Sequence, residues 1–175
     1  MIDKKINKLR NLIKLNNIDG YIVPKNDEFF SEYAFPNRLK TISNFSGSAG
    51  LAIILKDKNF LFVDGRYTLQ SKIESGNNFK IIEIPKLLPH DLLKKYKNKL
   101  LLGFDPKLFT NNSLKRNFKD SCYLLPLNQN LIDPMNSKKI HDYQKKAFYT
   151  LDDKIVGESL NSKINRLILY LKKKT

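Results

Sequence analysis

The chain has 175 residues, and its 32 basic against 17 acidic residues give a formal net charge of +15. This length suits one domain with an appendage, and such a chain buries enough surface to fold without disulfides. The single cysteine, Cys122, excludes an intramolecular disulfide and a cysteine-based zinc site. No apolar run is long enough for a membrane span, and the first residues lack the apolar core of a secretory signal, so we expect a cytoplasmic protein without a membrane partner.

The positive charge is carried mainly by lysine, which supplies 27 of the 32 basic residues. Arginine is the side chain best suited to bidentate contacts with phosphate and guanine, and the chain has only five. The composition therefore favours a solvated lysine surface and disfavours a nucleic-acid partner. A basic module that binds RNA or DNA stays as the alternative function.

The first third of the chain predicts a helix, a buried strand and an irregular segment. Residues 4–15 carry apolar residues at helical spacing, with Asp3 as the N-cap and Asn16-Asn17 as the end. The apolar run 21–23 is bounded by Gly20 and Pro24, which is typical of a short strand. Residues 25–45 are rich in aromatic residues and show no regular period.

The next elements alternate between strands and helices. Residues 51–55 and 60–63 flank a polar turn at 57–59, which predicts a β-hairpin. A proline in the first turn and Thr110 or Asn111 as a cap mark two of the helices that follow. In order, we expect a helix over 67–75, a strand over 80–84, a helix from Pro89 to Tyr96, a strand over 100–104, a helix over 112–119 and a strand over 123–125.

This alternation predicts an α/β domain of three layers, in which helices flank a mixed sheet. The sheet is mixed because the strands of the hairpin are antiparallel. We place this domain at residues 1–130 and read the polar residues 131–158 as a linker. Residues 159–175 predict one more amphipathic helix.

Residues 163–172 resemble residues 5–14 in their pattern of lysine, isoleucine, asparagine and leucine. One interpretation is that a second, similar domain begins at 159. The other is that any amphipathic helix of this composition looks alike. The residues alone leave both open.

The chemistry-bearing residues do not form a recognisable catalytic or metal-binding pattern. His90 and His141 lack a second histidine at helical spacing, and we expect both on the solvated surface. The carboxylates are scattered, and Asp27-Glu28 is expected to bond turns or lysines rather than act as an acid and base. Cys122 is expected to be a small buried apolar residue. We therefore predict no catalytic residue and no metal ligand set in this chain.

Two of the five arginines each lie next to a turn that contains glycine. Gly47 and Gly50 form a small-residue turn that lacks a phosphate-binding motif, so we expect a structural turn. Arg38 precedes this turn and is a candidate for binding a carboxylate of a ligand or partner. Arg66 follows Asp64-Gly65 at a strand end, where it either pairs with a nearby group or contacts a ligand.

Several sequence blocks together resemble the N-terminal domain of Xaa-Pro aminopeptidase (aminopeptidase P), a relative of creatinase and prolidase. Asn44 departs from the pattern, because the family commonly has glycine there. The matching blocks are 19–24 (DGYIVP), 31–33 (SEY), Arg38, 42–50 (ISNFSGSAG), 64–70 (DGRYTLQ), 103–106 (GFDP), 131–133 (LID) and 157–159 (GES).

The resemblance implies a creatinase N-terminal-like fold and a role without catalysis. In the three-domain members, two similar α/β domains precede a C-terminal catalytic domain whose dinuclear metal site, usually manganese, is held by two Asp, one His and two Glu. The chain would then hold the first domain and, at 159–175, the first helix of the second. By the same resemblance, Arg38, Phe45 and Arg66 are candidates for substrate or interface contact, and Gly47, Gly50, Asp64 and Gly65 for the structural turns.

The function implied by this resemblance is that of a non-catalytic N-terminal domain of a metallopeptidase that removes N-terminal residues preceding proline. The chain alone would be inactive and would need no cofactor, since manganese belongs to the catalytic domain. A third hypothesis is an assembly or regulatory subunit, with a second copy or a separate catalytic chain as its partner. The peptide substrate would be bound only by the full-length enzyme.

Overall fold

The computed structural model describes residues 2–31, 33–136 and 149–173. It divides into two compact units, Met1–His141 and Asp142–Thr175, and each is considered by itself. No helix among the described residues is long and apolar enough to cross a membrane.

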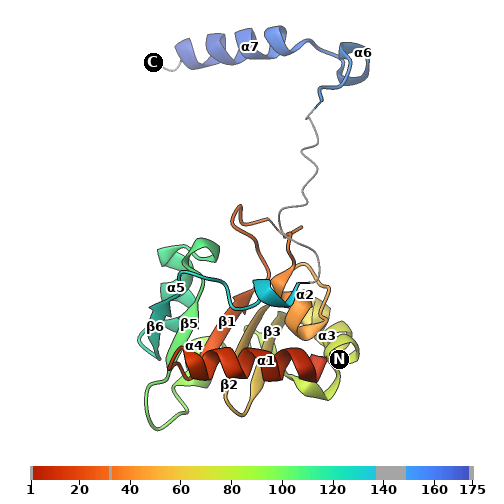
Figure 1. Ribbon diagram of the computed structural model, residues 1–175. Coiled ribbons are helices and arrows are strands. Elements are labelled where there is room, and N and C mark those ends of the chain that lie inside the picture. The colour runs from red at the N-terminus through yellow and green to blue at the C-terminus, as the bar shows by residue number, and fades with distance from the viewer. Residues whose placement is uncertain (1, 32, 137–148, 174–175) are drawn as a thin grey trace. The chain divides into compact units, whose positions relative to one another are not determined.

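The first unit is built on a six-stranded mixed sheet in the order β4-β3-β2-β1-β5-β6 (Figure 1). β1 pairs antiparallel with β2 and β2 with β3, whereas the other neighbouring pairs are parallel. This arrangement confirms the predicted mixed sheet and the predicted hairpin. The strands are β1 (Gly20–Pro24), β2 (Leu51–Leu55), β3 (Asn59–Asp64), β4 (Lys80–Ile84), β5 (Leu101–Phe104) and β6 (Tyr123–Pro126).

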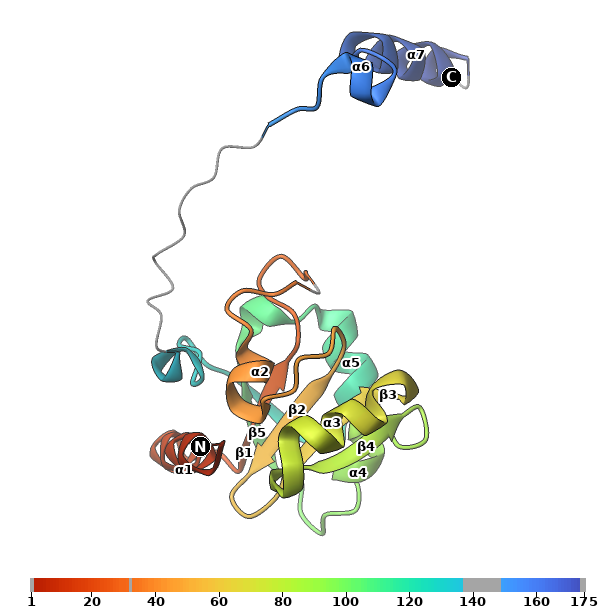
Figure 2. The ribbon, with the colours of Figure 1, turned by 90° about the vertical axis from the view of Figure 1, so that its right-hand side faces the viewer.

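Helices cover both faces of this sheet and complete the three layers (Figures 1 and 2). The helices α1 (Ile2–Leu15) and α2 (Arg38–Ser43) pack on one face through a core that includes Leu9, Ile13 and Leu39. The helices α4 (Pro89–Leu93) and α5 (Asn111–Phe118) pack on the other through Leu93 and Phe118. Helix α3 (Thr68–Ser75) connects the parallel strands β3 and β4.

Helix α1 forms because its apolar residues recur every three or four positions along one face. Ile2, Ile6, Leu9 and Ile13 are all buried against the sheet. The helix begins at Ile2, so Asp3 lies in the first turn rather than at the predicted N-cap. Asn17 adopts a φ of 52°, the left-handed conformation that we expected to end this helix.

The segment predicted to be irregular contains the short helix α2. Asn37 caps it, because the Asn37 Oδ1 accepts a hydrogen bond of 2.9 Å from the Lys40 backbone N–H. Leu39 and Ile42 are fully buried. Six residues give too few helical periods for the sequence to reveal this helix.

The first unit continues beyond the predicted boundary at residue 130. Leu131 and Ile132 are buried in the core beside α1, and the short 3-10 helix Asp133–Met135 follows them. The packed domain therefore includes part of the predicted linker, because two apolar side chains cover the sheet there. Residues 137–148 of that linker, with His141, lie outside the described residues.

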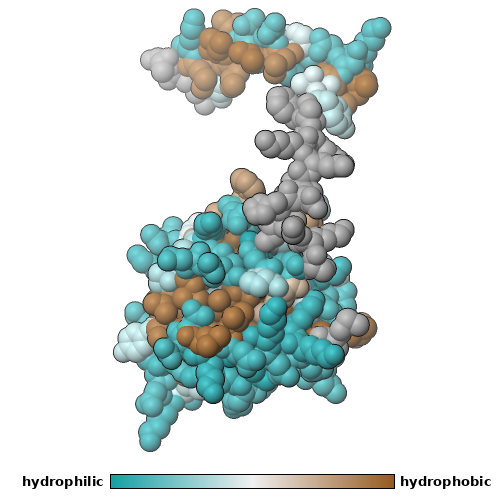
Figure 3. Space-filling model, viewed as in Figure 1, coloured by the Kyte–Doolittle hydropathy of each residue, from teal (hydrophilic) through white to brown (hydrophobic). Residues whose placement is uncertain are grey.

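The second unit contains the short helix α6 (Asp153–Val156) and the longer helix α7 (Leu160–Lys172). The Ser159 Oγ caps α7 by accepting a hydrogen bond of 3.2 Å from the Ser162 backbone N–H. Apolar side chains gather on the surface of α7 (Figure 3). Those that the sequence places on one face are exposed: Leu160, Ile164, Leu167, Ile168 and Leu171.

The first unit also shows an apolar area on the face that carries α1 (Figure 3). Leu101, Leu125 and Leu127 are partly buried there, together with Leu12 of α1. The helices on this face do not cover these leucines completely, so they keep some contact with solvent.

Candidate functional site

The candidate residues gather at one edge of the sheet, where β1, β3 and β5 end. These strands run parallel, so the residues after Pro24, Asp64 and Phe104 come together. The antiparallel strand β2 begins at the same edge, directly after Gly50. In open α/β sheets, ligands bind outside the carboxyl ends of the strands.

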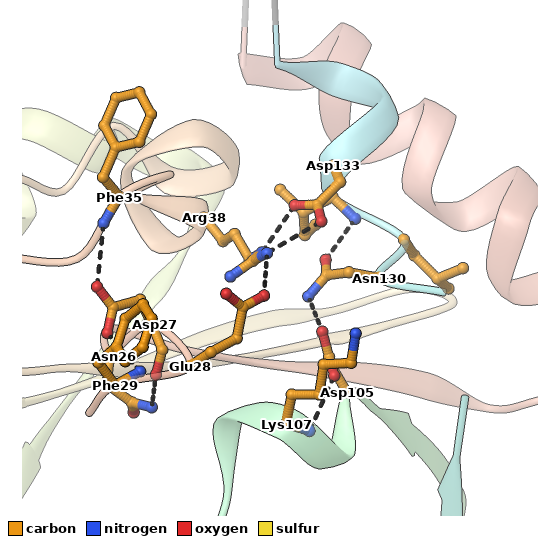
Figure 4. Close-up of polar contacts among 12 residues, drawn as sticks. Asn26, Asp27, Glu28, Phe29, Phe35, Arg38, Asp105, Lys107, Asn130 and Asp133 are labelled. Atoms are coloured by element: carbon orange, nitrogen blue, oxygen red, sulfur yellow. Dashed lines mark hydrogen bonds and ion pairs between the residues drawn. The ribbon is translucent and has the colours of Figure 1, made fainter. Parts of the chain in front are cut away.

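Arg38 lies at the centre of a group of polar side chains that we call the Arg38 cluster, namely Glu28, Arg38, Asp105, Asn130 and Asp133 (Figure 4). The Arg38 Nε donates to the Asp133 Oδ1 at 2.7 Å, and the Nη2 donates to the Asp133 Oδ2 at 3.0 Å. The Nη2 also approaches the Glu28 Oε1 at 3.3 Å. The carboxylates that Arg38 binds thus belong to its own chain.

The Arg38 side chain is only 2% exposed. Burial disfavours its charge, but the hydrogen bonds and charge of Asp133, with Glu28, raise the pKa of Arg38 above its ordinary value. The Nη1 is buried and has no hydrogen-bond partner among the described residues. The cluster therefore holds one guanidinium nitrogen whose N–H groups are unsatisfied within the described part of the chain.

The Arg38 cluster also ties the segment after β6 to the sheet. The Asn130 Nδ2 donates to the Asp105 Oδ2 at 2.9 Å, and the Asn130 Oδ1 accepts from the Ile132 backbone N–H at 2.9 Å. Asp105 in turn accepts a hydrogen bond from the Lys107 backbone N–H (Figure 4). These bonds and the buried Ile132 fix the course of the chain as it leaves the domain.

The loop after β1 is organised by the buried carboxylate of Asp27. It accepts hydrogen bonds from the backbone N–H groups of Phe29, Ser31 and Phe35 at 2.9, 3.0 and 3.4 Å. Figure 4 shows the bond from Phe35. Burial raises the pKa of Asp27, but these bonds outweigh it and hold the pKa below its ordinary value. The loop displays two aromatic side chains, Phe29 and Tyr33, that are 87% and 86% exposed.

The two blocks at 42–50 and 64–67 meet at the same edge of the sheet. The Phe45 ring is fully buried and contacts the Tyr67 ring edge to face, with centroids 5.7 Å apart. A hydrogen bond of 2.8 Å joins the Ser48 and Tyr67 hydroxyl groups. Phe45 is thus part of the core, and it positions the turn above it.

The glycine turn packs directly on the Phe45 ring. A Cβ at Gly47 would lie 2.2 Å from the Phe45 Cζ, and one at Gly50 would lie 3.0 Å from the Leu39 Cδ2. These close approaches explain the glycine at both positions. Asn44 adopts a φ of 62°, a left-handed conformation that asparagine tolerates better than most residues other than glycine.

Arg66 is the exposed one of the three candidates for substrate or interface contact, with 75% of its side chain accessible. Its Nη2 donates to the Asp64 Oδ2 at 2.8 Å, and its backbone N–H donates to the Asp64 Oδ1 at 3.0 Å. The Arg66 guanidinium holds the pKa of Asp64 below its ordinary value, and it lies 5.3 Å from the centroid of the Tyr67 ring. The pair shapes the turn and keeps a cation at the surface.

The sequence does not predict that three residues of the Arg38 cluster contact Arg38 or one another. Asp105, Asn130 and Asp133 carry no local signal, because their contacts join residues far apart in the chain.

His90 differs from the expected surface histidine, since its side chain is only 16% exposed. Cys122 is partly buried, and burial raises the pKa of its thiol to about 11.

The fold and the turns at this edge define an α/β domain with a mixed sheet, whose candidate residues lie at the carboxyl ends of parallel strands. The chain belongs to the creatinase/prolidase N-terminal domain family, whose model matches residues 5–129. This match confirms the resemblance that the sequence blocks indicate.

Curated relatives extend the similarity beyond the matched domain. The chain is 32% identical over 195 residues to Xaa-Pro aminopeptidase 1 of Dictyostelium discoideum, which covers 99% of this chain and 30% of that protein. It is 32% identical over 174 residues to a probable Xaa-Pro aminopeptidase P of Coprinopsis cinerea, covering 94% of this chain and 28% of that protein. The chain therefore spans less than a third of the length of these relatives.

Solved structures share the fold. The X-prolyl aminopeptidase of Caenorhabditis elegans, described as a cytosolic enzyme with a di-nuclear active site, matches with a TM-score of 0.73 and 24% identity, over 99% of this chain and 31% of that one. The N-terminal domain of the peptidase PepQ from Mycobacterium tuberculosis matches with a TM-score of 0.58 and 18% identity, over 76% of this chain and 98% of that one. Both confirm the creatinase N-terminal-like fold.

The described residues do not fit the dinuclear metal centre that the family resemblance implies. Within residues 2–31, 33–136 and 149–173, no three histidine, cysteine, aspartate or glutamate side chains gather closely enough to hold a metal ion. The carboxylates of the Arg38 cluster are occupied by Arg38 and Asn130 instead. No hydrolytic step is therefore derived from these residues.

Proposed function

We propose that the chain is the non-catalytic N-terminal domain of an aminopeptidase-P-like metallopeptidase that removes N-terminal residues preceding proline. The observation that carries this proposal is the alignment of nearly the whole chain with less than a third of each Xaa-Pro aminopeptidase relative. The cytosolic description of the Caenorhabditis elegans enzyme supports a cytoplasmic location.

Residues 159–175 would be the first helix of a second, similar domain. The exposed apolar side chains of α7 support this proposal, because an amphipathic helix is normally stabilised by packing its apolar face. The resemblance between residues 5–14 and 163–172 supports it as well.

The three candidates for substrate or interface contact would have two different roles, direct contact and positioning. Arg66 is exposed and would make the contact itself. Arg38 and Phe45 are buried and would position the loop 25–37 and the glycine turn that surround it. The full-length enzyme would then use this edge of the sheet beside its catalytic domain.

A second candidate function is that of an assembly or regulatory subunit for a separate catalytic chain or a second copy. The exposed Phe29 and Tyr33 favour it, because Asp27 holds their loop in one conformation and fixed aromatic side chains are common in interfaces. Whether the neighbouring reading frame encodes the remaining domains would distinguish these two functions.

The purified chain tests the first proposal directly. Incubated with Mn²⁺ and an Xaa-Pro peptide, it should release the first residue no faster than Mn²⁺ alone. The assay follows the free amino acid, with an active aminopeptidase P as the positive control. Turnover above the metal-only rate that survives repurification would contradict a non-catalytic role.

A further inference from the structure

A hollow lies at the opposite end of the sheet from the Arg38 cluster, where the β2–β3 hairpin turns. This hairpin pocket has a volume of about 920 Å³ and lies between α1, residues 57–60, residues 77–80 and residues 92–97. Its volume is within the range of small-molecule sites, which is roughly 300–1,000 Å³. Neither the matched family nor the proposed function assigns it a ligand.

The hairpin pocket has a surplus of positive charge. Five of its lining residues are basic and two are acidic, which leaves a surplus of three. Like charges around a concave surface focus their potential into the hollow, which a flat lysine surface does not do. The basic residues are Arg10, Lys58, Lys80, Lys95 and Lys97, and the acidic ones are Asp3 and Asp57.

Hydrogen bonds fix the polar wall of the hairpin pocket before any ligand arrives. The Arg10 Nε donates to the Leu55 carbonyl oxygen at 3.1 Å, and its Nη2 donates to the Asn59 Oδ1 at 3.1 Å. The Asn59 Nδ2 then donates to the Asn78 carbonyl oxygen at 2.8 Å. A guanidinium has five N–H donors, so these two bonds leave donors for the oxygens of an anion.

The pocket also has an aromatic wall. Tyr96 is half-buried and lines it together with Phe60 and Leu92. Burial, with the charge of Asp57, raises the pKa of the Tyr96 phenol, so this side chain is neutral at physiological pH and does not repel an anion. A flat ring beside cations and amide groups suits a ligand that has both a phosphate chain and a planar ring.

We propose that the hairpin pocket binds a small phosphorylated ligand of nucleotide size. The phosphates would lie against Arg10 and the lysines 58, 95 and 97, and the ring would lie against Tyr96. The limited volume of the hollow and the scarcity of arginine favour a small ligand over an RNA strand.

The experiment uses the full chain, labelled with ¹⁵N, at physiological salt and without divalent metal. It is titrated separately with ATP, inorganic tripolyphosphate, adenosine and a single-stranded RNA. We expect ATP to bind most tightly and to shift the side-chain amide resonances of Asn7, Asn59 and Asn77. Tripolyphosphate should bind the same residues more weakly, and adenosine should cause no shift.

A pair of charge-matched variants locates the binding. Lys95→Glu/Lys97→Glu should weaken ATP binding by about tenfold or more, a loss of about 1.4 kcal/mol. Lys107→Glu/Lys115→Glu changes the net charge equally, at exposed residues outside the pocket, and should bind ATP like the unchanged chain. Circular dichroism would verify that both variants fold.

Three results would overturn the proposal. They are equal loss of ATP binding in both variants, shifts spread over surface lysines without the asparagine amides, and RNA binding tighter than ATP binding. Equal affinity for tripolyphosphate and ATP would overturn the contact between the ring and Tyr96.

Discussion

Arg38 is a buried cation whose charge is balanced within its own chain. Asp133 binds it through two parallel hydrogen bonds, a geometry that fixes both the direction and the distance of the pair. Removing one partner of a buried ion pair is costly, because the other charge stays in a medium of low dielectric constant. This cost makes the role of Arg38 measurable.

We expect Asp133→Ala to lower the free energy of unfolding by about 2–4 kcal/mol, because it removes the carboxylate that binds the buried Arg38 guanidinium through two hydrogen bonds. Urea unfolding followed by circular dichroism measures the change. Asp57→Ala is the matched control, since its carboxylate is 69% exposed, and it should change stability by less than about 0.5 kcal/mol. Equal effects of the two variants would show that Asp133 does not stabilise Arg38.

The sequence singles out Arg38 but not its partners. Few arginines and a nearby special turn mark the residue, whereas Asp133 lies 95 positions away and no local pattern links the two. The same holds for Phe45 and Tyr67, whose contact depends on β3 lying beside β2. The sequence can thus mark a residue that needs an interaction partner, but only the fold determines which residue that partner is.

At the scale of elements, the loop after β1 obtains its shape from one carboxylate instead of from a helix or strand. Three backbone N–H groups converge on Asp27, so the loop has a fixed conformation without regular secondary structure. This accounts for the irregular character that the sequence predicts for much of 25–37. It also makes the loop sensitive to acid.

We expect Asp27→Asn to lower the free energy of unfolding by about 1–2 kcal/mol at pH 7, because hydrogen bonds to a charged acceptor are lost. The native pKa of Asp27 lies below its ordinary value of 3.8, so its contribution is complete above about pH 4 and falls as the pH drops through the lowered native pKa. Chemical unfolding at pH 7 and near pH 2 measures both stabilities. The difference between wild type and variant should shrink at the lower pH, and a constant difference would contradict this account.

At the scale of the whole molecule, the net charge of +15 does not explain the site at the edge of the sheet where β1, β3 and β5 end. The arginines of that site form internal ion pairs, and a surplus of three positive charges lines the hairpin pocket at the other end of the sheet. The first unit has two apolar cores, one on each face of the sheet. It therefore has the means to fold without residues 150–175.

We expect deletion of residues 150–175 to change the thermal midpoint of the first unit by less than about 2 °C, because both cores remain intact. Thermal unfolding followed by circular dichroism measures the midpoint. Deletion from residue 129 onward is the comparison, since it removes the buried Leu131 and Ile132 together with Asp133, and it should lower the midpoint by about 10 °C or more. A large drop after the shorter deletion would show that α7 stabilises the first unit.

The sequence by itself determined most of the regular elements, the mixed sheet and the family. Strands and helices leave periodic apolar patterns, and the blocks at 42–50 and 64–70 are specific enough to indicate the family. It also indicated the turn at Gly47 and Gly50, although not the Phe45 ring that requires it.

Only the tertiary structure decided where the domain ends and which residues meet. The sequence places Leu131 and Ile132 in a linker, but they are buried because they cover the folded sheet. Helix α2 has only six residues, which is too short for a recognisable helical pattern in the sequence. The Arg38 cluster and the hairpin pocket each assemble side chains from separate elements. Such sites depend on how the strands are ordered, because contacts between distant residues leave no mark on the local sequence.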